Sequence, residues 1–236
     1  MVELDIIIPV YNESSNIITV LESFRRSVRT PFRVFICYDQ EEDNTLPPLR
    51  EYKNSPFDIV LVKNQGVGAH GAVVSGFRAS SAPAVLVFPA DDTYNAGIID
   101  TLYQKFKDPC DIVVASRFIK GGKMVGCRWL KQVLVRLSSF TLYYMARLPV
   151  RDATNGFRLF SRRLLNTITI ESTMGFAFSL ELLVKCHRLG WKIGEVPALW
   201  HERKGGSSRF RIAQWIPVYL RWYFFAFETT YCGKRP

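Results

Sequence analysis

The sequence lacks most of the short signatures by which enzymes are recognised. Its three histidines form no pair at metal-ligand spacing, and it contains no GxSxG element and no Walker phosphate loop. Its five cysteines are odd in number and scattered, without a CxxC pair, so neither a zinc site nor a disulfide framework is expected. A serine hydrolase triad and a P-loop nucleotide site therefore have no support, and a reducing compartment is the default.

Long hydrophobic runs are also missing. The start, MVELDIIIPV, has no basic segment ahead of its apolar residues and no small-residue cleavage site, so it is predicted to be a strand and not a signal peptide. In the aromatic tail, residues 210–232, the longest uncharged run is 212–220, far below the about 20 residues that span a bilayer. We therefore expect no signal peptide and no transmembrane helix in this chain.

The composition fits a packed globular protein. Of 236 residues, 48% are hydrophobic and 22% charged, which argues against disorder. The net charge is +10 and aromatic residues make up 14%, crowded towards the C-terminus. This balance indicates a polyanionic or membrane-surface partner, with a merely basic soluble enzyme as the alternative.

Short β-branched runs alternate with helix-compatible segments in the first half. The runs are 4–10, 32–38, 58–62, 84–88 and 111–116, and the segments between them are 14–28, 44–53, 69–81 and 95–107. This alternation predicts an α/β fold with a Rossmann-like, mostly parallel sheet and helices on both faces. Ligands of such sheets bind beyond the carboxyl ends of the strands.

The second half is less regular. Residues 121–126, GGKMVG, are predicted to be a flexible link, followed by an amphipathic helix at 128–148. On a helical wheel its polar side holds Arg128, Lys131, Gln132, Arg136, Ser139 and Arg147, with Val135, Leu142 and Tyr143 among them. Its apolar side holds Leu130, Val133, Leu134, Leu137, Phe140, Tyr144 and Leu148. A strand at 157–160, a helix near 175–189 and a strand at 192–196 complete the body.

The tail is predicted to be a helix that lies in a bilayer interface. Its polar residues Gln214, Arg221 and Glu228 recur every seven residues and form one narrow stripe, and Pro217 is expected to kink it. The alternative is a terminal helix packed on the sheet or in a dimer.

Two adjacent carboxylates, Asp91 and Asp92, follow a predicted buried strand. Oxygen ligands at a strand end suit Mg²⁺ or Mn²⁺ when water and diphosphate supply the other ligands. A loop or a helix cap accounts for many such pairs, but Asp39 and Arg117 also follow predicted strands and should meet at the same edge.

Arginines form a second group of candidate residues. Phosphate-binding candidates are Arg117, Arg158, Arg203, Lys204 and Arg209, the last three in a glycine- and serine-rich run. A solvated basic loop is the alternative for that run. His201, beside Glu202, is interpreted as a structural or surface histidine.

Taken in order, the motifs resemble those of family-2 glycosyltransferases, most of all the polyprenyl-phosphate glycosyltransferases of the dolichyl-phosphate mannose synthase type. The resemblance covers residues 4–209. The motifs are IPVYNE at 8–13, the Asp39/Asp43/Thr45 pattern, the glycine segment followed by ADD at 90–92, SRF at 116–118, DATNGFR at 152–158, the helix with Glu181, and EVP at 195–197 with R-x-x-G-x-S-R at 203–209.

The resemblance implies a GT-A fold and inverting transfer of a hexose from a nucleotide diphosphate sugar, of the GDP-mannose or UDP-glucose type, to a polyprenyl or dolichyl phosphate. Carried over by position, it assigns the nucleotide sugar to Pro9, Tyr11, Glu13, Asp39, Ala90 and Asp91, and the metal to Asp91 and Asp92. It assigns the phosphates of donor and acceptor to Arg117, Arg203, Ser208 and Arg209, with Asp91, Asp92, Arg117 and Arg203 as the catalytic set.

This chain departs from the family pattern at two positions. Pro89 stands where the family has its first metal-binding acid, and Tyr38 stands where an acid is common. These changes bear on metal affinity and on recognition of the base.

The resemblance also implies a place in the cell. We expect a GT-A domain at 1–209, which includes the amphipathic helix at about 128–148 as a membrane-interface helix, and a tail at 210–236. Both are expected to lie peripherally at the cytoplasmic face of a membrane, with no nucleic acid as partner. A homo-oligomer or a membrane-anchoring partner is compatible with this. Two alternatives remain: a family-2 transferase with a saccharide or other lipid acceptor, and a non-catalytic subunit that binds a membrane partner.

Overall fold

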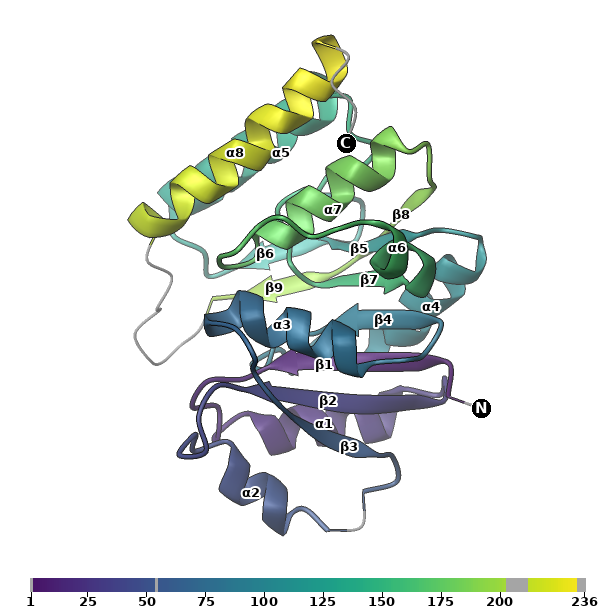
Figure 1. The fold of residues 1–236 in the computed structure, drawn as a ribbon, viewed down its shortest axis with the longest axis vertical. Coiled ribbons are helices and arrows are strands. Elements are labelled where there is room, and N and C mark those ends of the chain that lie inside the picture. Colours follow the sequence, from purple (N-terminus) through teal and green to yellow (C-terminus); the bar gives the residue numbers. More distant parts are fainter. Residues whose placement is uncertain (1, 54, 203–211, 233–236) are drawn as a thin grey trace.

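A seven-stranded sheet forms the centre of the protein (Figure 1). The computed structural model describes residues 2–53, 55–202 and 212–232. In spatial order the strands are β3 (Ile59–Lys63), β2 (Phe32–Tyr38), β1 (Leu4–Pro9), β4 (Ala84–Val87), β7 (Arg158–Ser161), β5 (Ile112–Ser116) and β8 (Ile193–Pro197). Strand β7 runs antiparallel to both of its neighbours, and all other pairs are parallel. The predicted mostly parallel sheet is confirmed.

Helices cover both faces of this sheet, as predicted. One face packs against α1 (Ile17–Ser27), α2 (Leu46–Glu51) and α4 (Ile99–Lys107), which the short 3₁₀ turn Ala96–Ile98 precedes. The other face packs against α3 (Gly68–Ala79), α6 (Arg162–Thr167) and α7 (Ala177–Arg188).

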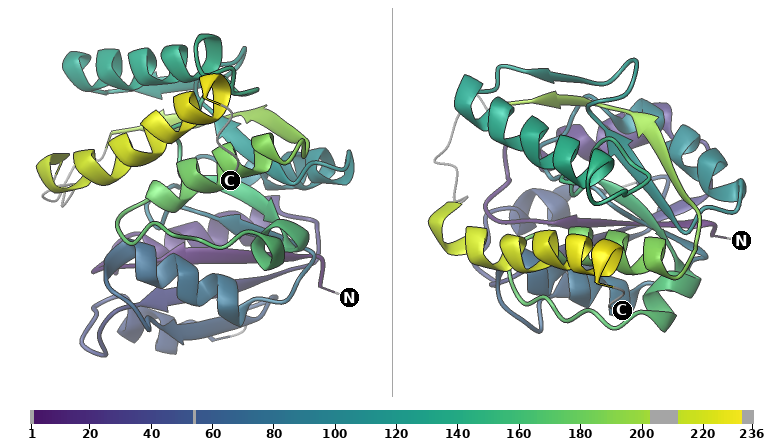
Figure 2. Two further views of the ribbon diagram at one scale, coloured as in Figure 1. Left: turned by 45° about the horizontal axis from the view of Figure 1, so that its top comes forward. Right: turned by 90° about the horizontal axis from the view of Figure 1, so that it is seen from above.

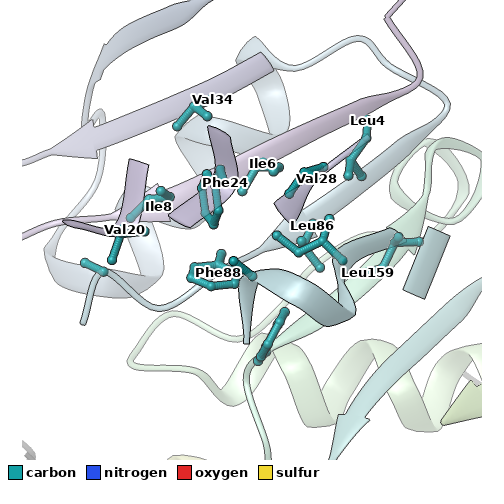
Figure 3. Packing of buried hydrophobic residues seen from close by; sticks show 14 of the residues in the cluster. Leu4, Ile6, Ile8, Val20, Phe24, Val28, Val34, Leu86, Phe88 and Leu159 are labelled. Carbon is teal, nitrogen blue, oxygen red and sulfur yellow. The ribbon is translucent and has the colours of Figure 1, made fainter. Parts of the chain in front are cut away.

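Alternation along β1 divides the core into two layers. Ile6 and Ile8 point to the α1 side, whereas Ile7 points to the α3 side, and all three are fully buried. On α1 the buried residues fall at helical spacing, and one of them, Phe24, packs edge-to-face on Phe88 with 4.8 Å between ring centroids (Figure 3). A central strand with apolar residues on both sides buries both sets of side chains only in such a three-layer structure.

The segment 121–126 is not a flexible link, and this prediction was wrong. Its residues form β6 (Lys123–Val125), which pairs in parallel with β9 (Leu199–His201) in a separate two-stranded sheet. The sequence analysis predicted neither β9 nor α6. Strands of three residues are too short to show a period, and their pairing across about 75 residues is decided by tertiary contacts.

Two further helices, α5 (Trp129–Tyr144) and α8 (Ile212–Tyr231), lie outside the layers that cover the sheet (Figure 2). Helix α8 continues through Pro217 and packs on α7, burying Trp222, Ala226 and Thr229. It touches α5 through Thr141, whose Oγ1 lies 2.7 Å from the hydroxyl of Tyr223. Within the described ranges, none of the helices has the length and apolar character needed to cross a membrane.

Helix α5 has an unusual environment. Only Ser139 and Leu142 are buried among its residues, so its polar side faces the protein. The side predicted to be apolar is exposed, and its large exposed residues are Trp129, Leu130, Val133, Leu134, Leu137, Phe140 and Tyr144. The segment predicted to be helical at 128–148 forms a helix at Trp129–Tyr144, and the exposed apolar residues just named are not covered by the rest of the described chain.

Candidate functional site

Predicted site residues gather at one edge of the sheet. Pro9 ends β1, Asp39 follows β2, Asp91 follows β4 and Arg117 follows β5. These four strands run in the same direction, so their carboxyl ends meet. The fold therefore brings together the residues that sequence spacing alone left far apart.

A network of backbone and side-chain hydrogen bonds joins the loops after β1 and β2. Asn12, in the left-handed region with φ of 56°, donates its backbone N–H to Asp43 Oδ1 at 3.1 Å. Glu13 donates its own N–H to Thr45 Oγ1 at 2.9 Å and is buried, whereas Tyr11 is exposed. The two motifs thus form one rigid wall, with Tyr11 as its accessible ring.

Asp39 lies against the glycine segment that leads into α3. Its Oδ1 accepts a hydrogen bond from Asn64 Nδ2 at 2.6 Å, and Asn64 Oδ1 accepts the N–H of Gly66 at 2.8 Å. A Cβ at Gly71 would lie 2.6 Å from Asn64 Oδ1 and 2.8 Å from the Gly66 backbone, so only glycine fits there. The tight turn into α3 thus holds Asn64 against Asp39 and orients the Asp39 carboxylate.

Asp92 shapes the loop after β4. Its Oδ1 accepts the backbone N–H groups of Tyr94 at 2.9 Å and Asn95 at 3.0 Å, and its Oδ2 accepts Asn95 Nδ2 at 2.6 Å. Burial raises the pKa of Asp92 above its ordinary value, against the effect of these hydrogen bonds. Asn95 in turn donates to the carbonyl of Leu199 and accepts its N–H, which ties this loop to β9.

The carboxylates of this loop fit a cation that takes most of its ligands from substrate. In the described part of the chain, no group of three or more histidine, cysteine, aspartate or glutamate residues could hold a metal ion. Asp91 and Asp92 are the two carboxylates of this loop, and Asp92 Oδ2 accepts one of the three hydrogen bonds given above. Mg²⁺ is commonly held by one or two carboxylates together with phosphate oxygens and water, and a pair of carboxylates matches that ligand set.

Arg117 is held by a carboxylate from the DATNGFR motif. Its Nε and Nη2 donate to Asp152 Oδ2 and Oδ1 at 2.7 and 2.8 Å, and Nη2 also donates to Thr154 Oγ1 at 2.8 Å. Burial alone would raise the pKa of Asp152, but the charge of Arg117 and its hydrogen bonds hold that pKa below the ordinary value. The orientation of the guanidinium is therefore fixed.

The expectation that Arg158 contacts phosphate was wrong. Its side chain is fully buried, and it donates to the carbonyls of Ser179 and Ala153. Burial lowers its pKa to about 10. An arginine enclosed in this way does not reach a ligand.

A cavity of about 310 Å³ opens between the SRF segment and α5. Three arginines line it, Arg117, Arg136 and Arg151, together with the aromatic side chains Phe118, Phe140, Tyr143 and Tyr144. Ser139, also in the lining, is 2% exposed, and its Oγ has no hydrogen-bond partner among the described residues. A buried hydroxyl without a partner is costly, so a polar ligand is expected here.

Sequence reasoning missed Arg136, Ser139 and Arg151 as candidate ligands. The helical wheel placed Arg136 and Ser139 on the polar side of α5, but only the fold shows that this side faces Arg117. Arg151 is held by aromatic contacts, with its guanidinium carbon 4.3 Å from the ring centroid of Tyr143 and its Nη1 donating to Tyr144 at 3.0 Å.

Four predicted site residues, Arg203, Lys204, Ser208 and Arg209, lie outside the described residues. His201, which precedes them, stacks on Tyr94 with 3.9 Å between ring centroids and 19° between planes. His70 is buried against Phe178 and Ser172. His201 and His70 thus make packing contacts, as expected of structural histidines.

A model of the family described as glycosyl transferase family 2 matches residues 5–169. Three curated proteins are similar over most of this chain. A dolichol-phosphate mannosyltransferase of Pyrococcus furiosus is 24% identical over 224 residues, which are 93% of this chain and 62% of that protein. A dolichyl-phosphate hexose transferase of Haloferax volcanii is 29% identical over 87% of this chain and 86% of its own length. An undecaprenyl-phosphate mannosyltransferase of Micrococcus luteus is 27% identical over 86% of this chain and 85% of its own length.

Solved structures show the same fold. Glucosyl-3-phosphoglycerate synthase from Mycobacterium tuberculosis, in complex with Mn²⁺, UDP and glucosyl-3-phosphoglycerate, has a TM-score of 0.70 at 16% identity, covering 99% of this chain and 81% of that one. The complex of the same enzyme with Mg²⁺ and UDP has a TM-score of 0.69 at 17% identity, and the match covers 99% of this chain and 80% of that one. The expected GT-A architecture is confirmed.

Proposed function

This chain belongs to glycosyltransferase family 2, and from that membership we propose that it transfers a hexose, with inversion, from a nucleotide diphosphate sugar to a polyprenyl phosphate at a membrane surface. All three relatives are named for transfer to a dolichyl or undecaprenyl phosphate. The chain spans 62% of the Pyrococcus enzyme, so activity and substrates remain proposals. The observation that carries the proposal is the cavity with three arginines beside the predicted donor site.

The donor occupies the carboxyl edge of β1, β2 and β4. Pro9, Tyr11, Glu13 and Asp39 surround the nucleoside, and Ala90 and Asp91 lie at the diphosphate. Support comes from the single wall that the loops after β1 and β2 form, and from the hydrogen bond between Asn64 and Asp39. The donor is of the GDP-mannose or UDP-glucose type.

Asp91 and Asp92 would hold Mg²⁺ or Mn²⁺. The related fold of the mycobacterial synthase binds Mn²⁺ or Mg²⁺ together with UDP. When bound, the cation would neutralise negative charge on the diphosphate. Pro89 leaves this loop without a third carboxylate, so the diphosphate must supply a larger share of the ligands.

The acceptor phosphate occupies the cavity between Arg117 and α5. A phosphate monoester accepts several hydrogen bonds, and arginine forks match its oxygens. Arg117, Arg136 and Arg151 supply the positive charge, and the Oγ of Ser139 gains the partner that it lacks within the described chain. Arg203, Ser208 and Arg209 remain predicted phosphate ligands in addition.

No general base is required for this reaction. The second pKa of a phosphate monoester is about 6, so the attacking oxygen is already ionised at neutral pH. The protein needs to place that oxygen in line with the anomeric carbon and to stabilise the departing diphosphate. Arg117, fixed by Asp152, serves the first purpose, and Asp91 with its cation site serves the second.

The exposed face of α5 docks on the bilayer that carries the acceptor. Its apolar residues are directed away from the protein, and the chain from 112 to 151 contains basic residues but no aspartate or glutamate. Such a surface fits apolar lipid tails below anionic headgroups. Phe140 and Tyr144 belong both to this exposed face and to the cavity, so a lipid phosphate would reach the arginines from the bilayer side. The site would be peripheral, at the cytoplasmic face; a homo-oligomer or an anchoring partner stays a prediction.

A substrate panel tests the proposal. The purified protein is incubated with Mg²⁺ or Mn²⁺, with GDP-mannose or UDP-glucose, and with either undecaprenyl phosphate, dolichyl phosphate or soluble saccharides. We expect transfer to a polyprenyl phosphate and not to a saccharide. Transfer to saccharides alone would replace this function by that of another family-2 enzyme, and binding without any turnover would favour a non-catalytic subunit.

Two separate variants, Ser139→Val and Arg136→Gln, test the acceptor cavity. Each should raise the KM for the polyprenyl phosphate and leave the KM for the donor unchanged, and the loss of the arginine charge in Arg136→Gln should raise the former by about tenfold or more. Lys120→Gln, a charge change outside the cavity lining, is the matched control. Equal effects of all three variants would contradict a phosphate site in this cavity.

A further inference from the structure

Tyr94 and His201 form an aromatic pair between the donor loop and the acceptor side of the site. Tyr94 lies two residues after Asp92 on the loop that follows β4, and His201 ends β9. Their rings are nearly parallel, with 3.9 Å between centroids and 19° between planes. Even with one face stacked in this way, Tyr94 is 57% exposed.

The backbone around this pair is unusually well fixed. Tyr94 donates its N–H to Asp92 Oδ1, and Asn95 exchanges two hydrogen bonds with the backbone of Leu199 at 2.6 and 2.9 Å. Asn95 is 2% exposed, so these bonds are protected from water. The backbone segments that carry the two rings are therefore tied to each other beside the stack.

The position of the pair coincides with the gap that a hexose must bridge. On one side, Tyr94 belongs to the loop with Asp91, where we place the diphosphate. On the other side, β9 pairs with β6, with His201 opposite Val125, and β6 leads directly into α5 and the arginine cavity. In a nucleotide sugar the hexose follows the second phosphate, and its anomeric carbon must face the acceptor phosphate.

The chemistry of an exposed aromatic ring suits a sugar. The face of the ring carries the negative part of its quadrupole, whereas the C–H bonds on one face of a pyranose are polarised positively. A ring that is already oriented loses little side-chain entropy when the sugar binds. A rigid, half-exposed tyrosine next to phosphate-binding groups is thus a surface for a hexose ring.

We propose that Tyr94 is the stacking surface for the transferred hexose, with His201 as the positioning residue that orients its ring. The inference rests on the proposed function and adds to it a residue that determines which sugar is accepted. A hexose whose apolar C–H face can lie flat on Tyr94 binds, and one with an axial hydroxyl on that face is disfavoured.

Calorimetric titration of four nucleotides tests this inference. UDP, UDP-glucose, GDP and GDP-mannose are titrated, with MgCl₂, into the wild-type protein and into Tyr94→Ala, Tyr94→Phe and His201→Ala. Of the two nucleotides, UDP and GDP, we consider the one that the wild type binds, together with its nucleotide sugar. We expect Tyr94→Ala to lower the affinity for the nucleotide sugar about fivefold and the affinity for the bare nucleoside diphosphate less than twofold. Tyr94→Phe keeps the ring and should match the wild type, and His201→Ala should lie between the two.

The outcomes separate this inference from the proposed function. If Tyr94→Ala weakens the diphosphate and the sugar nucleotide equally, Tyr94 only shapes the loop and the inference fails. If Tyr94→Ala changes neither affinity, it fails as well. If the wild type binds none of the four nucleotides, the proposed function fails and the hexose surface with it.

Discussion

Arg117 and Asp152 are both buried and are joined by three hydrogen bonds, two from the guanidinium and one from the backbone N–H of Arg117. Their motifs, SRF and DATNGFR, are visible in the sequence, but nothing in either motif says that one pairs with the other. The same holds for Arg158, whose motif context resembled that of a phosphate ligand and whose side chain is enclosed by backbone carbonyls. At the scale of residues, the sequence shows the type of each side chain, but it does not show whether that side chain is accessible to a ligand.

Replacing Asp152 by asparagine should destabilise the protein at neutral pH. The change leaves the Arg117 charge buried without its partner, a situation that costs about 3–5 kcal/mol. Urea unfolding of the wild type and Asp152→Asn at pH 7 measures the difference. Lys63→Gln, which removes an ion pair between two exposed side chains, Lys63 and Glu41, should cost far less.

The acid stability of the two proteins should also differ. Because the pKa of Asp152 is lower in the folded state than its ordinary value of 3.8, its contribution is complete above pH 3.8 and is lost as the pH falls through the folded pKa. The wild-type unfolding free energy should therefore drop below pH 4 more steeply than that of Asp152→Asn. Parallel curves would show that this carboxyl does not titrate as proposed.

Asp91 and Asp92 should respond differently to loss of charge. Asp91→Asn should lower kcat by about 10²-fold or more, because it removes the main carboxylate of the cation site. Asp92→Asn keeps an oxygen that can accept from Tyr94 and Asn95, so its main effect should be a higher metal concentration for half-maximal activity. Activity measured against MgCl₂ and MnCl₂ gives both quantities. Full transfer activity in Asp91→Asn with metal present would contradict the assignment.

Among the elements, α5 and α8 differ although both were predicted to be interfacial. Helix α5 buries only Ser139 and Leu142 and presents its apolar residues to the outside. Helix α8 uses much of its aromatic surface for packing on α7, and Trp222 is 2% exposed. The alternative of a packed terminal helix thus describes part of α8, and its exposed residues Leu220, Phe224 and Tyr231 remain for a membrane or a partner.

Charges on the exposed face of α5 should abolish membrane binding without unfolding the protein. Val133→Glu with Leu137→Glu places two carboxylates where we predict lipid contact, and neither residue is buried. Co-sedimentation with anionic liposomes should fall about tenfold or more, with an unchanged melting temperature. Undiminished co-sedimentation of this variant would contradict the docking role of α5.

The substitution Trp222→Ala should lower the free energy of unfolding of the protein. Removing a large buried aromatic side chain costs about 3–5 kcal/mol. Thermal unfolding is expected to show this loss, whereas Phe224→Ala, on the exposed side of the same helix, should change the melting temperature little and reduce liposome binding. A tail truncation would mix the two effects, because it removes both sides of α8.

Considered as a whole, the protein concentrates its +10 charge beside its exposed apolar face. The stretch 112–151 provides the arginines of the cavity and the basic residues that flank α5. Binding to vesicles with anionic lipids should therefore weaken as salt rises from about 0.05 to 0.5 M, and vesicles of neutral lipids should bind less at every salt concentration. Salt-independent binding would indicate that only apolar contacts operate.

The sequence by itself determined the class of fold, the strands of the seven-stranded sheet and the family, but not the separate pair of β6 and β9. These features follow from local causes: β-branched runs fit strands, amphipathic spacing fits helices, and motif residues keep their order along the chain. It also located the carboxyl edge of the sheet, since parallel strands must place their ends together.

Tertiary structure alone decided which side chains meet and which face outwards. The pairing of β6 with β9, the enclosure of Arg158, the cavity that joins Arg117 to α5, and the stack of Tyr94 on His201 all depend on contacts between distant segments. Such contacts form only after loop closure over many residues, and no local pattern encodes them. The helical wheel showed that α5 has an apolar face, and only the fold showed that this face is uncovered.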